Sequence, residues 1–476
     1  MLTSLPPSTR CYSALKKEPI DMNVATPAQN PLGIEPIPRL LWRFSLPAIV
    51  GMMVNALYNV VDRIYIGNAP NLGANGIAGI TISFPIMIIL LAMGVLYGIG
   101  GATLFSIRLG QGKEEEAAAV LQNAVILLIG TGIVIVILGM LFVGPLLRAF
   151  GASEQILPYA KSYLRIILMG SVFAITSMGM NHFIRADGSP KIAMLSMFLG
   201  AGTNIILDPI FIFGFGWGME GAALATIISQ FFSFIWVLSY FLGKRSRVRL
   251  RLKAIRPQWS VMKMIMSLGI PPFSMQLVSS LLNVILNKTL MAHGGDLGIS
   301  AMGIVNSLQT LLLMPVIGIN QGTQPLISFN FGAKKYDRVR EASRLAIIFS
   351  TAVVLVGWIA TRLWPQAMVG LFNREPALLE LGTYALTTWF LLTPLIGFQI
   401  IAGSFFQAIG RSKTSLLLIL SRQGLFLIPA ILIFANAFGL QGILWAAPVS
   451  DGLSFLITSS FFIWGYKNLE KIAPKI

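Results

Sequence analysis

The chain has 476 residues, of which 55% are hydrophobic and only 11% are charged. This composition excludes a soluble globular protein, in which about a quarter of the residues carry a charge. A transmembrane helix needs about 20 apolar residues, and the apolar residues of this chain suffice for about twelve such helices. The composition therefore predicts a polytopic helical membrane protein. Its single cysteine, Cys11, excludes an intrachain disulfide.

Residues 1–38 are polar and rich in proline, and we interpret them as a disordered cytoplasmic tail. After this tail, long runs without charged residues predict twelve spans once they are divided at clusters of Gly, Pro and Asn. The spans lie near residues 45–67, 77–107, 118–143, 159–183, 192–213, 220–242, 261–292, 299–330, 341–364, 382–407, 413–435 and 441–465. The expected fold class is an all-α integral membrane protein.

The net charge of +17 would fit a nucleic-acid partner in a soluble protein. In a membrane protein, however, Lys and Arg collect in the cytoplasmic loops. With the N-terminus inside, most of the basic residues fall in the predicted inner segments. The charge therefore predicts that both termini are cytoplasmic, and it indicates a lipid bilayer rather than a nucleic acid as the partner.

The two halves of the chain resemble each other at a shift of 222 residues. The matched pairs are Gly76 with Gly298, Gly100 with Gly322, Ser106 with Ser328, Gly110 with Gly332, Ala186 with Ala408, Gly188 with Gly410 and Lys191 with Lys413. Six spans per copy bring both copies into the membrane from the same side. We therefore predict an N-lobe (39–243), a linker (244–258), a C-lobe (259–466) and a C-terminal cytoplasmic tail (467–476).

The linker alternates basic and apolar residues from Lys244 to Lys253. We interpret it as a segment held at anionic lipid headgroups. A DNA-binding arm is the competing interpretation, although a segment fixed between two spans suits that role poorly.

Two acids inside predicted spans have similar neighbours. Tyr58 precedes Asp62 by one helical turn, and Asn204 precedes Asp208 by one turn, so that each carboxylate shares a helix face with an oxygen ligand. Thr226, in the next span, can complete a cluster of oxygen atoms suited to a hard cation or to proton exchange. Ionisable groups inside a membrane are expensive, and they mark functional sites by default. We predict that these five residues form a cation- or proton-coupling site.

Three further residues inside predicted spans carry hypotheses. Pro47 and Pro209 each remove a backbone donor and are predicted hinges. Asp451 is the acid of the C-lobe, where it either contacts substrate or serves lobe packing. Deformable thioethers and amides suit a cavity for varied cations. The candidates for the wall of such a substrate cavity are Met53, Met178, Met275, Gln276, Asn306, Met314 and Asp451.

Other patterns carry less weight. The glycine pattern over residues 216–221 fits a dinucleotide-binding motif, but no strand and helix alternate around it, so we interpret it as a loop. His182 and His293 are the only histidines and lie far apart in the sequence, which argues against a metal site between them. The sequence has no P-loop lysine motif, and ATP is not the expected energy source.

Several segments resemble the multidrug and toxic compound extrusion (MATE) family. They are residues 46–49, 57–67, 185–191 and 220–226, and the resemblance extends from about residue 36 to residue 466. It implies a bacterial inner-membrane antiporter of twelve helices in two lobes, which expels cationic drugs or dyes in exchange for Na⁺ or H⁺. One bacterial branch of this family resembles its DNA-damage-inducible members and has an ion site in the first lobe. The resemblance implies that Asp62, Asn204, Asp208 and Thr226 correspond to the residues of that site, with Tyr58 adjacent.

We therefore expect a monomeric drug antiporter that works by alternating access of its two lobes. It should be no enzyme and need no cofactor, and the only metal expected is a possible Na⁺ at Asp62, Asn204, Asp208 and Thr226. One alternative is a flippase for lipid-linked oligosaccharides of the same superfamily, and another is an ion channel. The sequence leaves the choice between H⁺ and Na⁺ open.

Overall fold

The computed structural model of the chain describes residues 30–67, 73–251 and 256–472. Most of the predicted tail (1–29), part of the linker (252–255) and the last residues (473–476) lie outside the described residues. The rest of the predicted tail has regular structure, because α1 (Pro31–Ile34) and the start of α2 (Ile37–Gly67) fall within it. Contacts made by α1 with the distant C-lobe hold this segment, and local sequence patterns do not reveal them.

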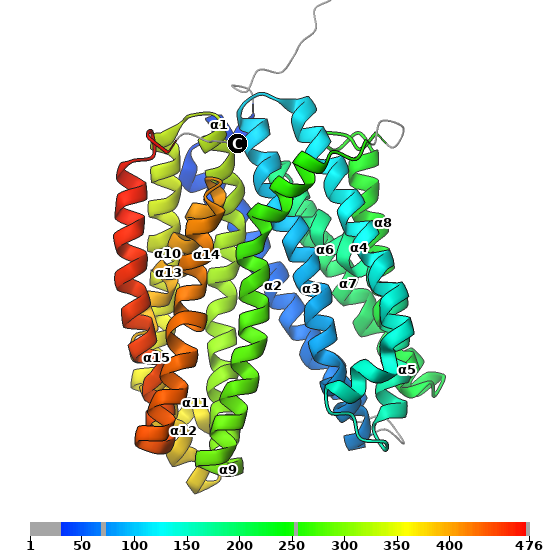
Figure 1. Ribbon diagram of the computed structural model, residues 1–476, viewed down its shortest axis with the longest axis vertical. Coiled ribbons are helices and arrows are strands. Elements are labelled where there is room, and N and C mark those ends of the chain that lie inside the picture. The colour runs from blue at the N-terminus through cyan, green and yellow to red at the C-terminus, as the bar shows by residue number, and fades with distance from the viewer. Residues whose placement is uncertain (1–29, 68–72, 252–255, 473–476) are drawn as a thin grey trace, which may run out of the picture.

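The N-lobe is built from the helices that follow α1 up to the linker (Figure 1). They are α2, α3 (Gly73–Gly110), α4 (Glu114–Ala149), α5 (Leu157–Met169), α6 (Ser171–Ala186), α7 (Pro190–Pro209) and α8 (Gly218–Leu242). α5 and α6 form one span that is bent by 54°. After α7 the chain continues as a π-helical segment, Ile210–Gly214.

The C-lobe repeats this arrangement. Its helices are α9 (Trp259–Gly332), α10 (Tyr336–Leu363), α11 (Pro365–Gly370), α12 (Pro376–Trp389), α13 (Pro394–Ala408), α14 (Ser412–Leu420) and α15 (Ile428–Lys467). α12 and α13 form a second bent span, with an angle of 48°. A π-helical segment, Ser421–Leu427, joins α14 to α15.

Eight helical stretches of the described residues are long and apolar enough to cross a membrane, and the two bent pairs raise this number to ten. Two of the eight are too long for one crossing of an apolar layer about 30 Å thick. They are α9, with 74 residues, and the stretch Ser412–Lys467, with 56 residues. Each is broken by a glycine outside the helical region, at Gly295 (φ 57°) and Gly439 (φ 61°). Each therefore contains two spans, which gives the twelve that the sequence predicted.

The two lobes also match in backbone conformation at the predicted shift. Gly188 and Gly410 both have positive φ, at 96° and 81°, in the turns after α6 and α13. Gly112 (φ 75°) corresponds to Lys334 (φ 57°), the one residue other than glycine with positive φ in the described part of the chain. The turn geometry after α3 and α9 is thus kept even where a side chain makes it less favourable.

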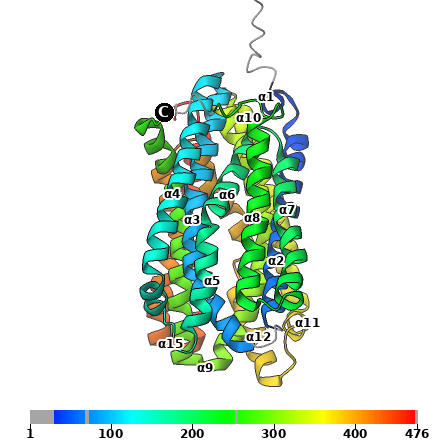
Figure 2. The same cartoon turned by 90° about the vertical axis from the view of Figure 1, so that its right-hand side faces the viewer.

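The lobes meet at one end of the molecule and diverge towards the other (Figure 1). At the joined end, which carries α1 and the end of α15, one hydrophobic core contains residues from both lobes. At the far end, each lobe has a separate core, one in the C-lobe and a smaller one in the N-lobe. Most helices run along the long axis of the molecule (Figure 2), so this asymmetry lies across the membrane.

Close helix crossings at glycines hold the joined end. A Cβ atom added at Gly110 would collide with the carbonyl oxygen of Phe329, and one at Gly332 would collide with that of Ile107. Gly110 and Gly332 correspond to each other in the repeat, so α3 and the end of α9 cross about the pseudo-twofold axis. Small residues let helix backbones approach closely, which is how helices associate within lipid.

The outer surface is apolar as well. In α4, the side chains of Val134, Ile137, Leu138 and Leu141 are at least half exposed, with exposed fractions of 50% to 69%. In water such a surface would be strongly unfavourable, whereas lipid tails solvate it at no cost.

Candidate functional site

The predicted acid pair, Asp62 and Asp208, comes together inside the N-lobe. Asp62 lies near the end of α2 and Asp208 near the end of α7, and these two helices pack against each other. The two carboxyl groups are close enough for a hydrogen bond between them when one carries a proton. Asp208 is fully buried, and Asp62 is partly buried.

Asn204 and Thr226 are joined to Asp208 by hydrogen bonds that run through the amide of Asn204. The side-chain nitrogen of Asn204 donates to Oδ1 of Asp208 (3.2 Å) and to Oγ1 of Thr226 (3.4 Å). Thr226 in turn donates its hydroxyl hydrogen to the carbonyl oxygen of Ala222 (3.0 Å). The amide of Asn204 is therefore oriented with its nitrogen towards these two residues, which leaves its oxygen free for another partner.

Two acceptor oxygens in this cluster have no hydrogen-bond donor among the described residues. They are Oδ1 of Asn204 and Oδ2 of Asp208, and both are buried. A buried acceptor without a donor is unfavourable, and a proton or a hard monovalent cation would satisfy it. The described residues contain no group of three or more His, Cys, Asp or Glu side chains arranged to hold a metal ion.

Tyr58 lies one turn before Asp62 on α2, near enough to both carboxyl groups to interact with them electrostatically. Pro209 is the last residue of α7, and the π-helical segment begins immediately after it. Single turns of π-helix frequently occur at functional sites. Pro47 lies inside α2, far from the acid pair, where α2 packs against the C-lobe.

α2 connects the two lobes. In its first half, Ser45 and Ile49 lie against Gly322 and Gly318 of α9, and the ring of Trp42 contacts that of Phe349 on α10 (5.1 Å between centroids). Its second half packs against α7 of the N-lobe. The helix that carries Asp62 therefore touches both lobes.

The residues predicted to line a substrate cavity differ in how far they are buried. Met53 is 53% exposed, and the others except Asp451 are partly exposed. Asp451 is only 1% exposed, and its Oδ1 accepts a charged hydrogen bond of 2.6 Å from Nε of Arg422. Gln399 donates to the backbone oxygen of Asp451 (2.7 Å). Of the two roles considered for Asp451, this position favours lobe packing.

Sequence reasoning missed two polar groups. Arg422 lies in the π-helical segment of the C-lobe, well inside a predicted span, and its charge, opposite to that of Asp451, could have suggested the pairing. At the junction of the lobes, Gln324 of α9 donates to Oγ1 of Thr103 on α3 (3.0 Å). No local pattern indicates that second contact, because its residues belong to different lobes.

Comparisons with known proteins agree with this architecture. The sequence model of the MatE family matches residues 47–210 and 271–433, one segment in each lobe. The multidrug export protein MepA of Staphylococcus aureus (strain MRSA252) is 28% identical over 421 residues, which cover 88% of this chain and 92% of that protein.

Two solved structures are also similar. One is an outward-facing conformation of a multidrug resistance MATE family transporter of the MOP superfamily, with a TM-score of 0.87 and 25% identity over 92% of this chain and 98% of that one. The other is the MATE multidrug transporter DinF-BH in complex with a dye, with a TM-score of 0.85 and 39% identity over 90% of this chain and 96% of that one.

Two pseudo-symmetric lobes of six spans, with a buried acid pair inside one of them, define a multi-pass membrane transporter. The chain belongs to the MatE family, the multidrug and toxic compound extrusion transporters. It is therefore a multidrug efflux transporter and not an enzyme.

Proposed function

We propose that this protein is a secondary active antiporter that exports cationic and amphipathic organic compounds in exchange for H⁺ or Na⁺. The observation that carries the proposal is the contact between the carboxyl groups of Asp62 and Asp208, which come from different helices of the N-lobe. Asn204, Thr226 and Tyr58 supply the surrounding oxygen atoms. The two lobes would expose a central substrate cavity alternately to either side of the membrane.

The acid pair can act as the coupling site because its charge is unfavourable. Two adjacent carboxylates repel each other strongly in a medium of low dielectric constant. Binding of a proton or a monovalent cation reduces this repulsion and stabilises the contact between them. The neutral pair lets α2 and α7 approach each other, and the charged pair drives them apart. Because α2 also contacts the C-lobe, a change at Asp62 can reach the contact between the lobes.

The position of the basic linker and the divergence of the lobes support one orientation of the protein in the membrane. The joined end carries the basic linker, and such segments face the cytoplasm. We propose that this end is cytoplasmic, in the inner membrane of a bacterium. The lobes diverge at the opposite end, so the conformation described here would be outward-facing, like that of the similar transporter. Ion binding at the acid pair would favour release of the drug from this state.

The proposed substrates are flat organic cations. The candidate wall residues Met53, Met178, Met275 and Met314 carry deformable thioethers, which suit varied aromatic ligands. The similar transporter DinF-BH was solved in complex with a dye, which supports dyes as substrates here. One chain contains all the residues of the acid-pair site, so we propose that the monomer is functional.

Asp208→Asn tests the role of the acid pair. The amide keeps the shape of the carboxyl group but cannot change its charge, so we expect efflux of ethidium from whole cells to fall at least tenfold, with normal expression. The matched control is Asp296→Asn, which changes an exposed aspartate of α9 and should leave efflux unchanged. Wild-type efflux by Asp208→Asn would remove the acid pair from the mechanism.

Vesicles containing the purified protein identify the coupling ion. Ethidium transport is measured with a sodium gradient alone and then with a pH gradient alone, and the gradient that drives transport names the ion. If neither gradient drives transport, the antiport proposal is refuted. A steady ion current in the absence of ethidium would instead indicate the channel alternative.

A further inference from the structure

The basic linker has a fixed conformation where the structure describes it. From residue 245 to 251 its side chains alternate: Ser246, Val248 and Leu250 are buried, whereas the arginines between them are exposed. Val248 and Leu250 are each only 4% exposed and belong to the core at the joined end. The backbone nitrogen of Leu250 donates to the carbonyl oxygen of Phe241 (3.0 Å). The arginines are therefore presented together at the surface by an anchored segment.

Asp187, in the turn between α6 and α7, anchors this segment. Its Oδ2 accepts hydrogen bonds from the hydroxyl groups of Tyr240 (2.6 Å) and Ser246 (3.1 Å) and from the backbone nitrogen of Arg247 (3.1 Å). Asp187 is only 3% exposed. Oδ2 of Asp187 thus holds the chain, and Asp187 makes no ion pair with the exposed basic side chains among the described residues.

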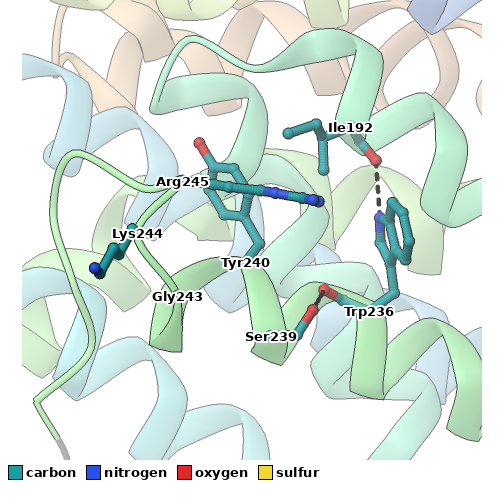
Figure 3. Close-up of a pocket in the computed structure, with 7 residues that line it drawn as sticks. All are labelled: Ile192, Trp236, Ser239, Tyr240, Gly243, Lys244 and Arg245. Atoms are coloured by element: carbon teal, nitrogen blue, oxygen red, sulfur yellow. Dashed lines mark hydrogen bonds between the residues drawn. The ribbon is translucent and has the colours of Figure 1, made fainter.

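A cavity of about 380 Å³ lies beside this anchor, between the start of α7 and the end of α8. We call it the corner pocket, and it is lined by Ile192, Trp236, Ser239, Tyr240, Gly243, Lys244 and Arg245 (Figure 3). The side chain of Arg245 extends across the pocket in this view, while Lys244 lies at its edge (Figure 3). The volume falls within the range typical of small-ligand sites.

Most polar groups of the pocket wall already have partners within the protein. Nε1 of Trp236 donates to the carbonyl oxygen of Ile192 (3.3 Å), and Ser239 donates to the carbonyl oxygen of Trp236 (2.8 Å). Tyr240 donates to Asp187, as described above. Lys244 and Arg245 form no ion pair among the described residues. The groups that remain for a ligand are therefore two cations, which suit an anion.

The apolar surface next to the pocket indicates what kind of anion. Phe232, Ile235 and Leu242 of α8 are each about 45% exposed, at 45%, 45% and 46%. Their spacing, together with that of Ser239, places them along one face of α8 that leads to the pocket. Tryptophan residues such as Trp236 are typical of the level where lipid headgroups meet acyl chains.

We propose that the corner pocket binds an anionic phospholipid of the surrounding leaflet. Lys244 and Arg245 contact the phosphate of the headgroup, the exposed arginines further along the linker add attraction to neighbouring headgroups, and an acyl chain lies along Phe232, Ile235 and Leu242. Because the linker joins the two lobes, the bound lipid fixes the start of this connection to the N-lobe. The site is separate from the acid pair and does not depend on its role.

Native mass spectrometry of the full-length protein, with added phosphatidylglycerol, tests the proposal. We expect the wild type to retain phosphatidylglycerol and to release phosphatidylcholine. The double substitution Lys244→Gln/Arg245→Gln should weaken the affinity for phosphatidylglycerol about thirtyfold, since each basic residue near the surface contributes on the order of fivefold. The matched control is Lys467→Gln/Lys471→Gln, which removes the same charge from exposed positions at the end of α15 and should retain the lipid.

Two results would overturn the proposal. Equal retention of phosphatidylglycerol by the double variant and the wild type would show that the pocket does not hold it. Binding of inorganic phosphate with the same affinity, measured by its effect on the melting temperature of the detergent-solubilised protein, would identify a site for soluble anions. Phe232→Ser should weaken binding of the lipid without affecting any binding of inorganic phosphate.

Discussion

Asp208 and Asp451 are both almost fully buried, yet their neighbours differ in charge. Asp208 faces a second carboxyl group, whereas Asp451 faces the guanidinium group of Arg422 at 2.6 Å. A carboxylate paired with a guanidinium has little need to bind another cation, and a carboxylate beside another carboxylate does. This contrast supports the proposal that the N-lobe acid pair exchanges ions, and it favours a packing role for Asp451 and Arg422.

The buried ion pair of Arg422 with Asp451 should contribute to the stability of the protein. Asp451→Asn leaves Arg422 without a counter-ion, which in a buried position costs about 3–5 kcal/mol. We expect Asp451→Asn to lower the melting temperature of the protein in detergent. The double substitution Asp451→Leu/Arg422→Met, which removes both charges, should reverse most of that decrease. Ethidium transport by the double variant should remain near the wild-type level. A stable double variant that no longer transports drug would assign Asp451 to substrate contact instead.

At the scale of single elements, α1 links the lobes through its backbone carbonyl groups. Asn330 donates to the carbonyl oxygen of Leu32 (3.0 Å), and Lys335 donates to that of Gly33 (2.8 Å). Arg338 donates to the carbonyl oxygens of Leu32 (3.1 Å) and Glu35 (2.7 Å). These donors lie at the turn between α9 and α10 of the C-lobe, so they fasten the start of α2 at the joined end.

Loss of these hydrogen bonds should shift the equilibrium between the outward-facing and inward-facing states of the proposed transport cycle. Arg338→Ala removes charged hydrogen bonds worth about 1.5–3 kcal/mol each, and we expect at least a tenfold shift away from the outward-facing state. The distance between spin labels at Ser153 and Glu375, in exposed turns at the diverging end, should shorten in a Cys11→Ser background. Arg340→Ala is the control, because Arg340 pairs with Asp337 of α10 and with Glu470 of the C-terminal tail. Unchanged distances in Arg338→Ala would contradict a role for α1 in this equilibrium.

At the scale of the whole molecule, the crossing at Gly110 and Gly332 decides how closely the lobes can approach at the joined end. Each glycine faces a backbone carbonyl of the opposite lobe, which cannot move aside as a flexible side chain could. The two positions are related by the internal repeat, so both lobes contribute the same kind of contact.

Gly332→Ala should therefore prevent close approach of the lobes at this end. We expect ethidium efflux to fall about tenfold at normal expression, because the outward-facing state is reached less often. Gly130→Ala is the matched control, since a Cβ atom there meets nothing within 4 Å. Equal efflux by the two variants would show that the crossing tolerates a methyl group and does not limit transport.

The parts of the structure that follow from local patterns were predictable. Each crossing of the bilayer requires an apolar run, and the breaks at Gly295 and Gly439 lie where the sequence separates two runs. The spacing of Asn204 and Asp208 on one helix face also follows from helix periodicity. Opposite charge could have suggested the contact of Arg422 with Asp451. The contact of Leu32 with Arg338 was not predictable, because it joins elements whose packing appears only in three dimensions.

The proposed acid pair also limits how steep a drug gradient the cell can maintain. If one carboxyl group exchanges one proton for one monovalent organic cation, no net charge crosses, and the membrane voltage adds nothing to the driving force. If both carboxyl groups are used, one net positive charge enters per cycle, and each 100 mV adds about 2.3 kcal/mol, or roughly fiftyfold in the concentration ratio. Arg422 already neutralises Asp451. The described spans therefore offer no third buried carboxyl group that could carry a further proton and increase the maximum drug concentration ratio.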